Sequence, residues 1–255
     1  MVIYVILTNF LFFVQYMSDN IITINNNCWI IVHEEHKNEI DSQWFDDKYW
    51  LNQGRLLGAS SGRGSAWMVK FANIKMMLRH YYRGGFPARF NKDKYLWTGL
   101  NKTRSFSEYR LLKKMHSLNL PVPEPVAAQV CKVGLFYQAN ILIKYINHQS
   151  TFAGLLNTDS STKSWQQVGK VIADFHNHGV YHADLNANNI LVDDKLVYLI
   201  DFDHSKQCPP RKMWQNANMK RLKRSIDKLT NSDYIETNEK KWQLLLQSYQ
   251  KIIKR

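Results

Sequence analysis

The sequence predicts an α+β fold of two lobes, a β-rich N-terminal lobe and a mainly helical C-terminal lobe. Two observations favour this class. Short β-like runs alternate with glycine-rich connections in residues 19–146, whereas helical periodicity dominates residues 147–255. The 255 residues, 45% of them hydrophobic, are enough for one large domain or for two small lobes that share a cleft.

Residues 1–18 form an apolar tail without a charged side chain. No basic residue opens the run, which argues against a secretory signal. Thr8, Asn9 and Gln15 dilute a stretch that is already near the lower length limit of a membrane-spanning helix. Three alternatives stay open: a short membrane anchor, a loose tail, or an over-extended gene start with Met17 as the native first residue.

The N-terminal lobe is predicted to hold several strands and one helix. The β-like runs are NIITI, CWIIV, SAWMVKFA and ANILIKYI, and the helix is SFSEYRLLKKMHSL, with Tyr109, Leu112 and Met115 on one face.

In the C-terminal lobe, a helix is predicted to begin at Ser164, which has capping-box spacing to Gln167, and to end before Gly179. The runs NILVD and LVYLID, joined by a turn at residues 193–195, predict a β-hairpin, and residues 238–253 predict a last helix.

Charge and cysteine content narrow the function classes. A formal net charge of +13 favours an anionic partner such as a nucleotide, a nucleic acid or an acidic membrane surface.

The three cysteines, Cys28, Cys131 and Cys208, are far apart, odd in number and without C-x-x-C spacing. We therefore expect neither a disulfide framework nor a zinc site, and a reducing cytoplasm is the simplest location.

The octapeptide HADLNANN, residues 182–189, lies between the predicted helix and the hairpin. Asp184 can accept the proton of an attacking hydroxyl, and Asn189 and Asp201 supply the hard oxygen atoms that Mg²⁺ prefers. This order of residue types predicts phosphoryl transfer from a nucleotide. His182, as a neutral imidazole, is expected to hold the loop and the hairpin together.

These residues resemble the protein-kinase-like superfamily, whose catalytic loop H-R-D-L-x-x-x-N is followed by D-F-G. The resemblance implies a two-lobe kinase fold that binds ATP and Mg²⁺ in its cleft. Ala183, Asn186 and Asp203 depart from the pattern at the arginine, at a frequent loop lysine and at the glycine. The proposed base and metal ligands remain.

The N-terminal lobe should then supply the phosphate-binding side of an ATP site. Gly58, Gly62 and Gly64 let backbone approach phosphates, and Lys70 follows in a β-like run, as in the V-A-I-K strand of kinases. Glu108 is the candidate ion-pair partner of Lys70. A structural role in a capping box with Ser105 is the alternative.

Nine Lys and Arg against the single acid Asp93 lie between Lys70 and Arg104. Arg79 and Arg83, beside two tyrosines and a Gly-Gly turn, suit an anionic acceptor because guanidinium binds carboxylate and phosphate through two hydrogen bonds. For any single lysine here, a solvated position is the simpler interpretation.

The segments GRGSAWMVKF, LRHYYRGG, LPVPEP and YHADLNANNILVD resemble the 3-deoxy-D-manno-octulosonic acid (Kdo) kinases, relatives of the lipopolysaccharide core heptose kinases. The resemblance implies phosphorylation of the Kdo 4-hydroxyl on a Kdo-lipid A precursor, by a peripheral protein at the cytoplasmic face of the inner membrane. It implies no nucleic-acid ligand, and no obligate protein partner is evident.

The C-terminal end favours a non-protein acceptor. Only 54 residues follow Asp201, without an A-P-E motif, so a truncated C-lobe is expected. The basic run RKMWQNANMKRLKR, with Trp214 and Met219, suits anionic headgroups or a solvated helix face equally. Alternative functions are a heptose kinase, a RIO-like protein kinase, or a non-catalytic basic binding module.

Overall fold

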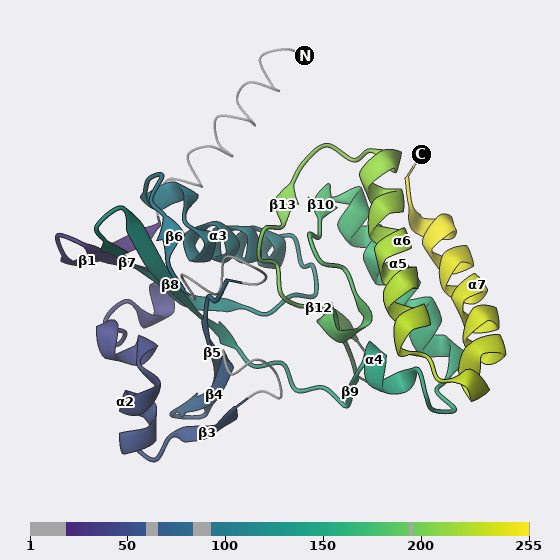
Figure 1. Ribbon diagram of the computed structural model, residues 1–255, viewed down its shortest axis with the longest axis horizontal. Helices are drawn as coiled ribbons and strands as arrows, with labels where there is room; N and C mark the ends of the chain where they lie inside the picture. Colours follow the sequence, from purple (N-terminus) through teal and green to yellow (C-terminus); the bar gives the residue numbers. More distant parts are fainter. Residues whose placement is uncertain (1–18, 60–65, 84–92, 194–195, 255) are drawn as a thin grey trace, which may run out of the picture. The chain divides into compact units, whose positions relative to one another are not determined.

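The computed structural model describes residues 19–59, 66–83, 93–193 and 196–254 (Figure 1). The described chain forms two compact units. One consists of the residues up to Phe106 together with Pro125–Ile143, and the other of Ser107–Glu124 and the residues from Lys144 onward. The apolar tail of residues 1–18 lies outside the described residues, and the lobes expected at 19–146 and 147–255 stay a prediction.

An eight-stranded sheet is the main feature of the first unit. The sheet has the strand order β1-β2-β7-β8-β5-β4-β3, and β6 pairs with β8. The four β-like runs of the sequence fall in β1, β2, β4 and β8, so these predicted strands are confirmed. The strands are β1 (Asn20–Asn25), β2 (Cys28–Val32), β3 (Leu56–Ala59), β4 (Ala66–Phe71), β5 (Ile74–His80), β6 (Tyr95–Leu96), β7 (Pro125–Val133) and β8 (Phe136–Lys144).

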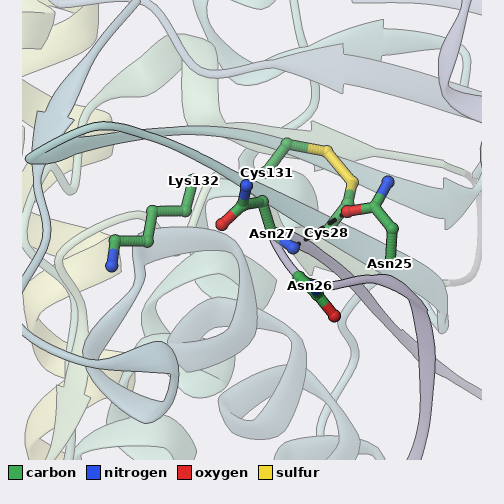
Figure 2. A pocket seen from close by; sticks show the side chains of 6 residues that line it. All are labelled: Asn25, Asn26, Asn27, Cys28, Cys131 and Lys132. Atoms are coloured by element: carbon green, nitrogen blue, oxygen red, sulfur yellow. Dashed lines mark hydrogen bonds between the residues drawn. A yellow bond between two sulfur atoms is a disulfide. The ribbon is translucent and has the colours of Figure 1, made fainter.

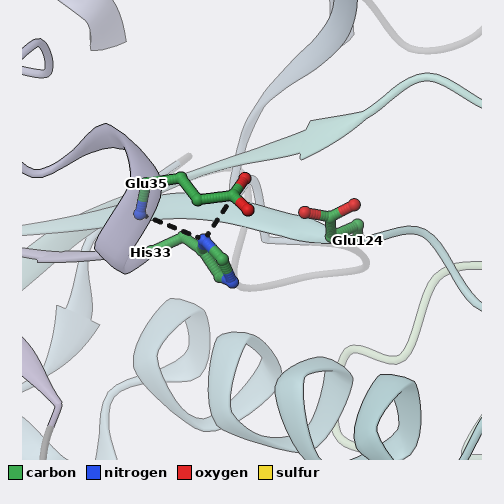
Figure 3. Close-up of side chains that lie close together, drawn as sticks. All are labelled: His33, Glu35 and Glu124. Atoms are coloured by element: carbon green, nitrogen blue, oxygen red, sulfur yellow. Dashed lines mark hydrogen bonds and ion pairs between the residues drawn. The ribbon is translucent and has the colours of Figure 1, made fainter.

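Short helices cover one part of this sheet: η1 (Glu34–His36), η2 (Ser42–Phe45) and α2 (Asp47–Asn52). Trp44 and Trp50 from these helices pack with Val69 and Met76 of the strands in a single hydrophobic cluster. The Trp50 indole donates a hydrogen bond to the Trp44 carbonyl at 2.7 Å, which satisfies the buried N–H. At the end of β2, His33 Nδ1 accepts from the backbone N–H of Glu35 and caps η1 (Figure 3).

Cys28 and Cys131 form a disulfide, contrary to the expectation from their sequence spacing. They are directly opposite each other in the antiparallel β2–β7 pair, with a Cα–Cα distance of 4.2 Å. The sheet therefore closes a separation of 103 residues that no local spacing reveals. Figure 2 shows the disulfide beside an open polar pocket that Asn25, Asn26, Asn27 and Lys132 also line. Cys208 is a free cysteine.

Helix α3 (Arg104–Ser117) matches the helix predicted for residues 105–118. It follows the turn η4 (Leu100–Lys102). Ser105 lies inside the helix, and its hydroxyl donates to the carbonyl of Gln129 in β7 at 3.1 Å. Ser105 is therefore not the N-cap, and the capping-box interpretation of Ser105 and Glu108 is wrong.

The second unit contains most of the helical residues. Its helices are α4 (Phe152–Leu155), α5 (Thr162–Asn177), α6 (Lys212–Leu229) and α7 (Ile235–Ile252), with the turns η5 (Ala187–Asn189) and η6 (Ser232–Tyr234). Two small antiparallel sheets accompany them. One has the order β12-β11-β9 and the other pairs β10 with β13. These strands are β9 (Ser150–Thr151), β10 (Val180–Tyr181), β11 (Ile190–Val192), β12 (Val197–Leu199) and β13 (Lys206–Gln207).

Helices α5 and α7 pack closely in this unit (Figure 1). A Cβ atom added to Gly169 of α5 would lie 2.3 Å from the carbonyl oxygen of Leu245 in α7, so only glycine permits this approach. The N-cap of α5 is Ser161, not Ser164 as predicted, because the Ser161 hydroxyl accepts from the N–H of Lys163. The helix ends before Gly179, whose φ is +71°, as expected. Among the described residues, no helix has the length and apolar character needed to cross a bilayer.

Candidate functional site

The loop that carries HADLNANN connects β10 to β11, and its first residue is buried. His182 is 2% exposed, and its Nε2 lies 3.0 Å from the carbonyl oxygen of Ile200, directly after β12. Its Nδ1 accepts from the backbone N–H of Asp184 at 3.1 Å. Burial lowers the pKa of His182 despite the neighbouring carbonyl and carboxylates, so the ring is neutral. The imidazole thus bonds both the loop and the β11–β12 hairpin, as expected.

Side chains on one face of helix α6 form hydrogen bonds with the backbone of the same loop. Asn218 accepts from the backbone N–H of His182 and donates to its carbonyl, at 3.3 and 2.8 Å. About two helical turns further along, the Ser225 hydroxyl accepts from the N–H of Ala187 at 3.1 Å. Asn218 is 2% exposed, so these bonds are protected from water. The sequence contained no signal for this docking.

Each carboxylate oxygen of Asp184 has its own donor. Asn186 Nδ2 donates to Oδ2 at 3.0 Å, and Arg221 Nη1 of α6 donates to Oδ1 at 2.9 Å. The Asn186 amide oxygen accepts from the N–H groups of Asn188 and Asn189, which fixes the residue in the turn η5. The sequence interpretation missed Arg221. One feature of the sequence could have indicated such a contact: the loop itself contains no lysine or arginine, so a cation beside Asp184 has to come from elsewhere in the chain.

Asn189 and Asp201 are both attached to this loop and its hairpin. Asn189 Nδ2 donates to the backbone carbonyl of Asp184 at 3.0 Å, which commits its amide nitrogen and leaves the amide oxygen to other ligands. Ile200 donates its N–H to the Asn189 carbonyl, so the chain reaches Asp201 one residue after a fixed junction. Asp201 has a φ of +62°, a left-handed conformation that sets it apart from the strand before it.

The predicted phosphate-binding residues are only partly described. Gly58 lies in β3 beside a register shift against β4, whereas Gly62 and Gly64 lie outside the described residues. Lys70 is exposed on β4, next to the fully buried Val69, so its side chain lies on the opposite face of the sheet from the Trp44 cluster.

Glu108 is 4% exposed on α3. A glutamate is rarely this buried without a partner, and Glu108 does take part in an interaction. Lys70 and Glu108 belong to different units, so the predicted ion pair stays a prediction.

Arg79 and Arg83 lie in a cluster of arginines and tyrosines in the first unit. The Arg79 guanidinium lies over the Tyr81 ring, and that of Arg83 over the Tyr95 ring, at 4.9 and 5.1 Å from the ring centroids. Arg104, at the start of α3, lies over both rings. Burial raises the pKa of Tyr95, so this phenol stays neutral beside these cations. The sequence placed Arg104 at the end of the basic segment but gave no indication of its contacts with the two tyrosine rings.

The basic run of residues 211–224 covers the N-terminal part of α6, and the two apolar residues singled out in the sequence, Trp214 and Met219, are buried. Trp214 is 9% exposed and Met219 6%, so neither of these two side chains is available to a headgroup layer, and the two alternatives for the run as a whole stay predictions. Met213 is 77% exposed instead, beside exposed Arg211 and Lys212.

Residues 47–249 match the model of the lipopolysaccharide kinase (Kdo/WaaP) family. The 3-deoxy-D-manno-octulosonic acid kinase of Actinobacillus succinogenes is 36% identical over 236 residues, which cover 88% of this chain and 97% of that protein. The protein of the same name from Stenotrophomonas maltophilia is 38% identical over 86% of this chain and 88% of its own length.

Two solved structures share the fold. WaaP in complex with acyl carrier protein has a TM-score of 0.55 at 13% identity, covering 87% of this chain and 88% of its own. Amicoumacin kinase hAmiN in complex with AMP-PNP, Ca²⁺ and Ami has a TM-score of 0.56 at 10% identity, covering 88% and 81%. The predicted protein-kinase-like α+β fold is therefore confirmed, and the chain belongs to the lipopolysaccharide kinase (Kdo/WaaP) family.

Proposed function

We propose that this protein transfers the γ-phosphoryl group of ATP to the 4-hydroxyl of the Kdo sugar on a Kdo-lipid A precursor. The geometry of Asp184 carries the chemical part of the proposal. Its carboxylate is about half exposed, so a substrate hydroxyl can approach it, and two separate donors fix its orientation. The choice of Kdo as the acceptor is supported by the curated relatives that are named Kdo kinases.

Asn189 and Asp201 are the proposed ligands of Mg²⁺. Carboxylate and amide oxygens match the preference of this hard cation, and the amide nitrogen of Asn189 is already committed to the Asp184 carbonyl. The bound ion would neutralise charge on the ATP phosphates. The bond from the Asn189 side-chain nitrogen to the Asp184 carbonyl orients the amide, and the backbone bond from Ile200 to the Asn189 carbonyl fixes the position of the residue, so the amide oxygen needs little reordering when a ligand arrives.

The phosphates of ATP are assigned to Gly58, Gly62, Gly64 and Lys70, with Glu108 as the partner that orients the lysine. Support comes from the exposed position of Lys70 on β4 and from the burial of the Glu108 carboxylate.

We assign the anionic groups of the acceptor to the arginine–tyrosine cluster, defined as Arg79, Arg83, Arg104, Tyr81 and Tyr95. Kdo carries a carboxylate and lipid A carries phosphates, and guanidinium groups bind both. The tyrosine rings hold the three cations near one another, which would otherwise repel.

A peripheral position at the cytoplasmic face of the inner membrane follows from a lipid acceptor. The proposed contact is the α6 basic end, defined as Arg211, Lys212 and Met213. Two exposed cations beside an exposed apolar side chain suit a layer of anionic headgroups.

Mass spectrometry of Kdo-lipid IVA after incubation with the enzyme, ATP and Mg²⁺ tests the proposal. One added phosphate, located on Kdo by fragmentation, is expected. Parallel reactions contain a heptosylated core acceptor and a generic peptide. If heptose or peptide is phosphorylated while Kdo-lipid IVA stays unmodified, the proposed acceptor is wrong, although the protein is still a kinase.

A further inference from the structure

The catalytic loop contains no cation, although it carries the proposed base and metal ligands. Between His182 and Asp193 there is no lysine or arginine, and Ala183 and Asn186 occupy the two positions where the resembling kinases have them. Phosphoryl transfer concentrates negative charge on the oxygens of the transferred group, and a nearby Arg or Lys normally stabilises it. Besides the proposed Mg²⁺ and Lys70, any cationic side chain next to Asp184 therefore comes from a segment outside the loop.

Among the described residues, Arg221 of α6 supplies a cation to this loop. Its Nη1 lies 2.9 Å from Oδ1 of Asp184, while Asn186 holds Oδ2. The two donors approach different oxygens, so together they define the rotation of the carboxylate. Arg221 is 45% and Asp184 55% exposed, and ion pairs of this exposure contribute little to folding stability. A structural role alone accounts poorly for the arrangement.

The placement of Arg221 is determined by the docking of α6. Asn218, Arg221 and Ser225 are spaced three and four residues apart, so they lie on one helix face, and all three bond to the loop. Leu222 and Ile226, at 0% and 1% exposure, anchor the adjacent face in the core. The guanidinium is thus presented by a rigid element, not by a loop.

The guanidinium retains donors for a second anion. Only Nη1 is used, and Nη2 and Nε have no hydrogen-bond partner among the described residues. Because a guanidinium carries five N–H donors in a planar fork, it can keep one bond to Asp184 and bind another oxygen alongside. Partial exposure leaves that side open to a ligand.

We propose that Arg221 is the cation of the transfer site, which orients Asp184 and donates to the oxygens of the transferring phosphoryl group. The inference rests on the proposed function. In the step, the acceptor oxygen forms a bond to the γ-phosphorus while the bond from the β–γ bridging oxygen to that phosphorus breaks. The hydroxyl proton passes to Asp184, and ADP leaves with the bonding electron pair. Arg221 keeps its charge throughout.

Three variants of the full chain test the proposal, with ADP release and phosphate incorporation measured on Kdo-lipid IVA. Arg221→Gln is expected to lower kcat by about 100-fold, as loss of one charge-stabilising donor does, with the KM for ATP nearly unchanged. Arg221→Lys should recover part of that loss, because it restores the charge without the fork. Arg224→Gln, an exposed arginine on the same helix, is the matched control and should retain wild-type kcat.

A kcat of Arg221→Gln within about 3-fold of the wild type would overturn the proposal. So would a raised KM for the acceptor at unchanged kcat, since that result describes a binding residue only. Equal melting temperatures of the three variants separate a chemical effect from unfolding. If the wild type phosphorylates heptose or water instead of Kdo, the proposed acceptor fails, and the same comparison on that reaction still decides the role of Arg221.

Discussion

The carboxylate of Asp184 receives hydrogen bonds from two segments 35 residues apart, Asn186 and Arg221, and is still about half exposed. Asp184→Ala should therefore lower kcat at least 1000-fold, within the range of about 10²–10⁴ for a general base plus the loss of the Arg221 contact. The melting temperature should hardly change, because no buried group loses a partner. Asp174→Ala, an exposed aspartate on α5, is the control. Unchanged transfer in Asp184→Ala would reject the mechanism.

His176 is a buried residue whose titration affects stability. It is 2% exposed, its Nδ1 lies 2.8 Å from the Tyr249 hydroxyl, and burial lowers its pKa to about 4. The unfolded chain, with a pKa near 6.5, binds more protons below that pH than the folded chain does. Stability is therefore complete above about pH 6.5 and is lost as the pH falls toward 4.

Urea denaturation should show the free energy of unfolding falling by about 2 kcal/mol between pH 7 and pH 5 from His176. His182, also buried with a lowered pKa, adds to the same slope. His176→Asn keeps a hydrogen-bonding group near Tyr249 and removes the titration, so its slope should be smaller. An identical slope in this variant would mean that His176 is not a source of the pH dependence.

At the scale of the elements, the α5–α7 packing depends on one glycine. A Cβ at position 169 would meet a backbone carbonyl at 2.3 Å, and a carbonyl in the middle of a helix cannot move aside cheaply. Gly169→Ala should lower the free energy of unfolding by about 1–3 kcal/mol, although alanine is the better helix former. Lys170→Ala, at the exposed neighbouring position, is the control and should be neutral. Equal stability of both variants in thermal melts would contradict the packing argument.

The sequence predicted which helices and strands form better than it predicted where they begin and end. Helix α7 and the β11–β12 hairpin follow directly from periodicity and from a turn, because their apolar faces repeat along the chain. The N-cap of α5 was misplaced by three residues because both Ser161 and Ser164 are suitable caps, and only the first has the required backbone. The short helix α2 had no periodic signal, since it is only six residues long.

At the scale of the whole molecule, the net charge of +13 suits a protein that works on an anionic lipid. Arg211→Gln with Lys212→Gln, at the α6 basic end, should weaken sedimentation with vesicles containing anionic lipids by about 30-fold, at roughly 1 kcal/mol per cation. Lys251→Gln with Lys254→Gln removes the same charge from the C-terminal end and should have a smaller effect. Equal losses in both double variants would show that net charge, not this surface, drives binding.

The sequence by itself determined the family, the α+β class and the residues of the loop, because local spacing encodes all three. The motif HADLNANN, followed by a predicted hairpin, can be recognised as a kinase-like catalytic loop without coordinates. Tertiary structure decided the partners that come from distant segments: the disulfide between Cys28 and Cys131, the Arg104 position over two tyrosines, and the Arg221 contact with Asp184. The physical reason is the same in each case. Such contacts depend on strand register or helix docking, which bring together residues that share no local pattern.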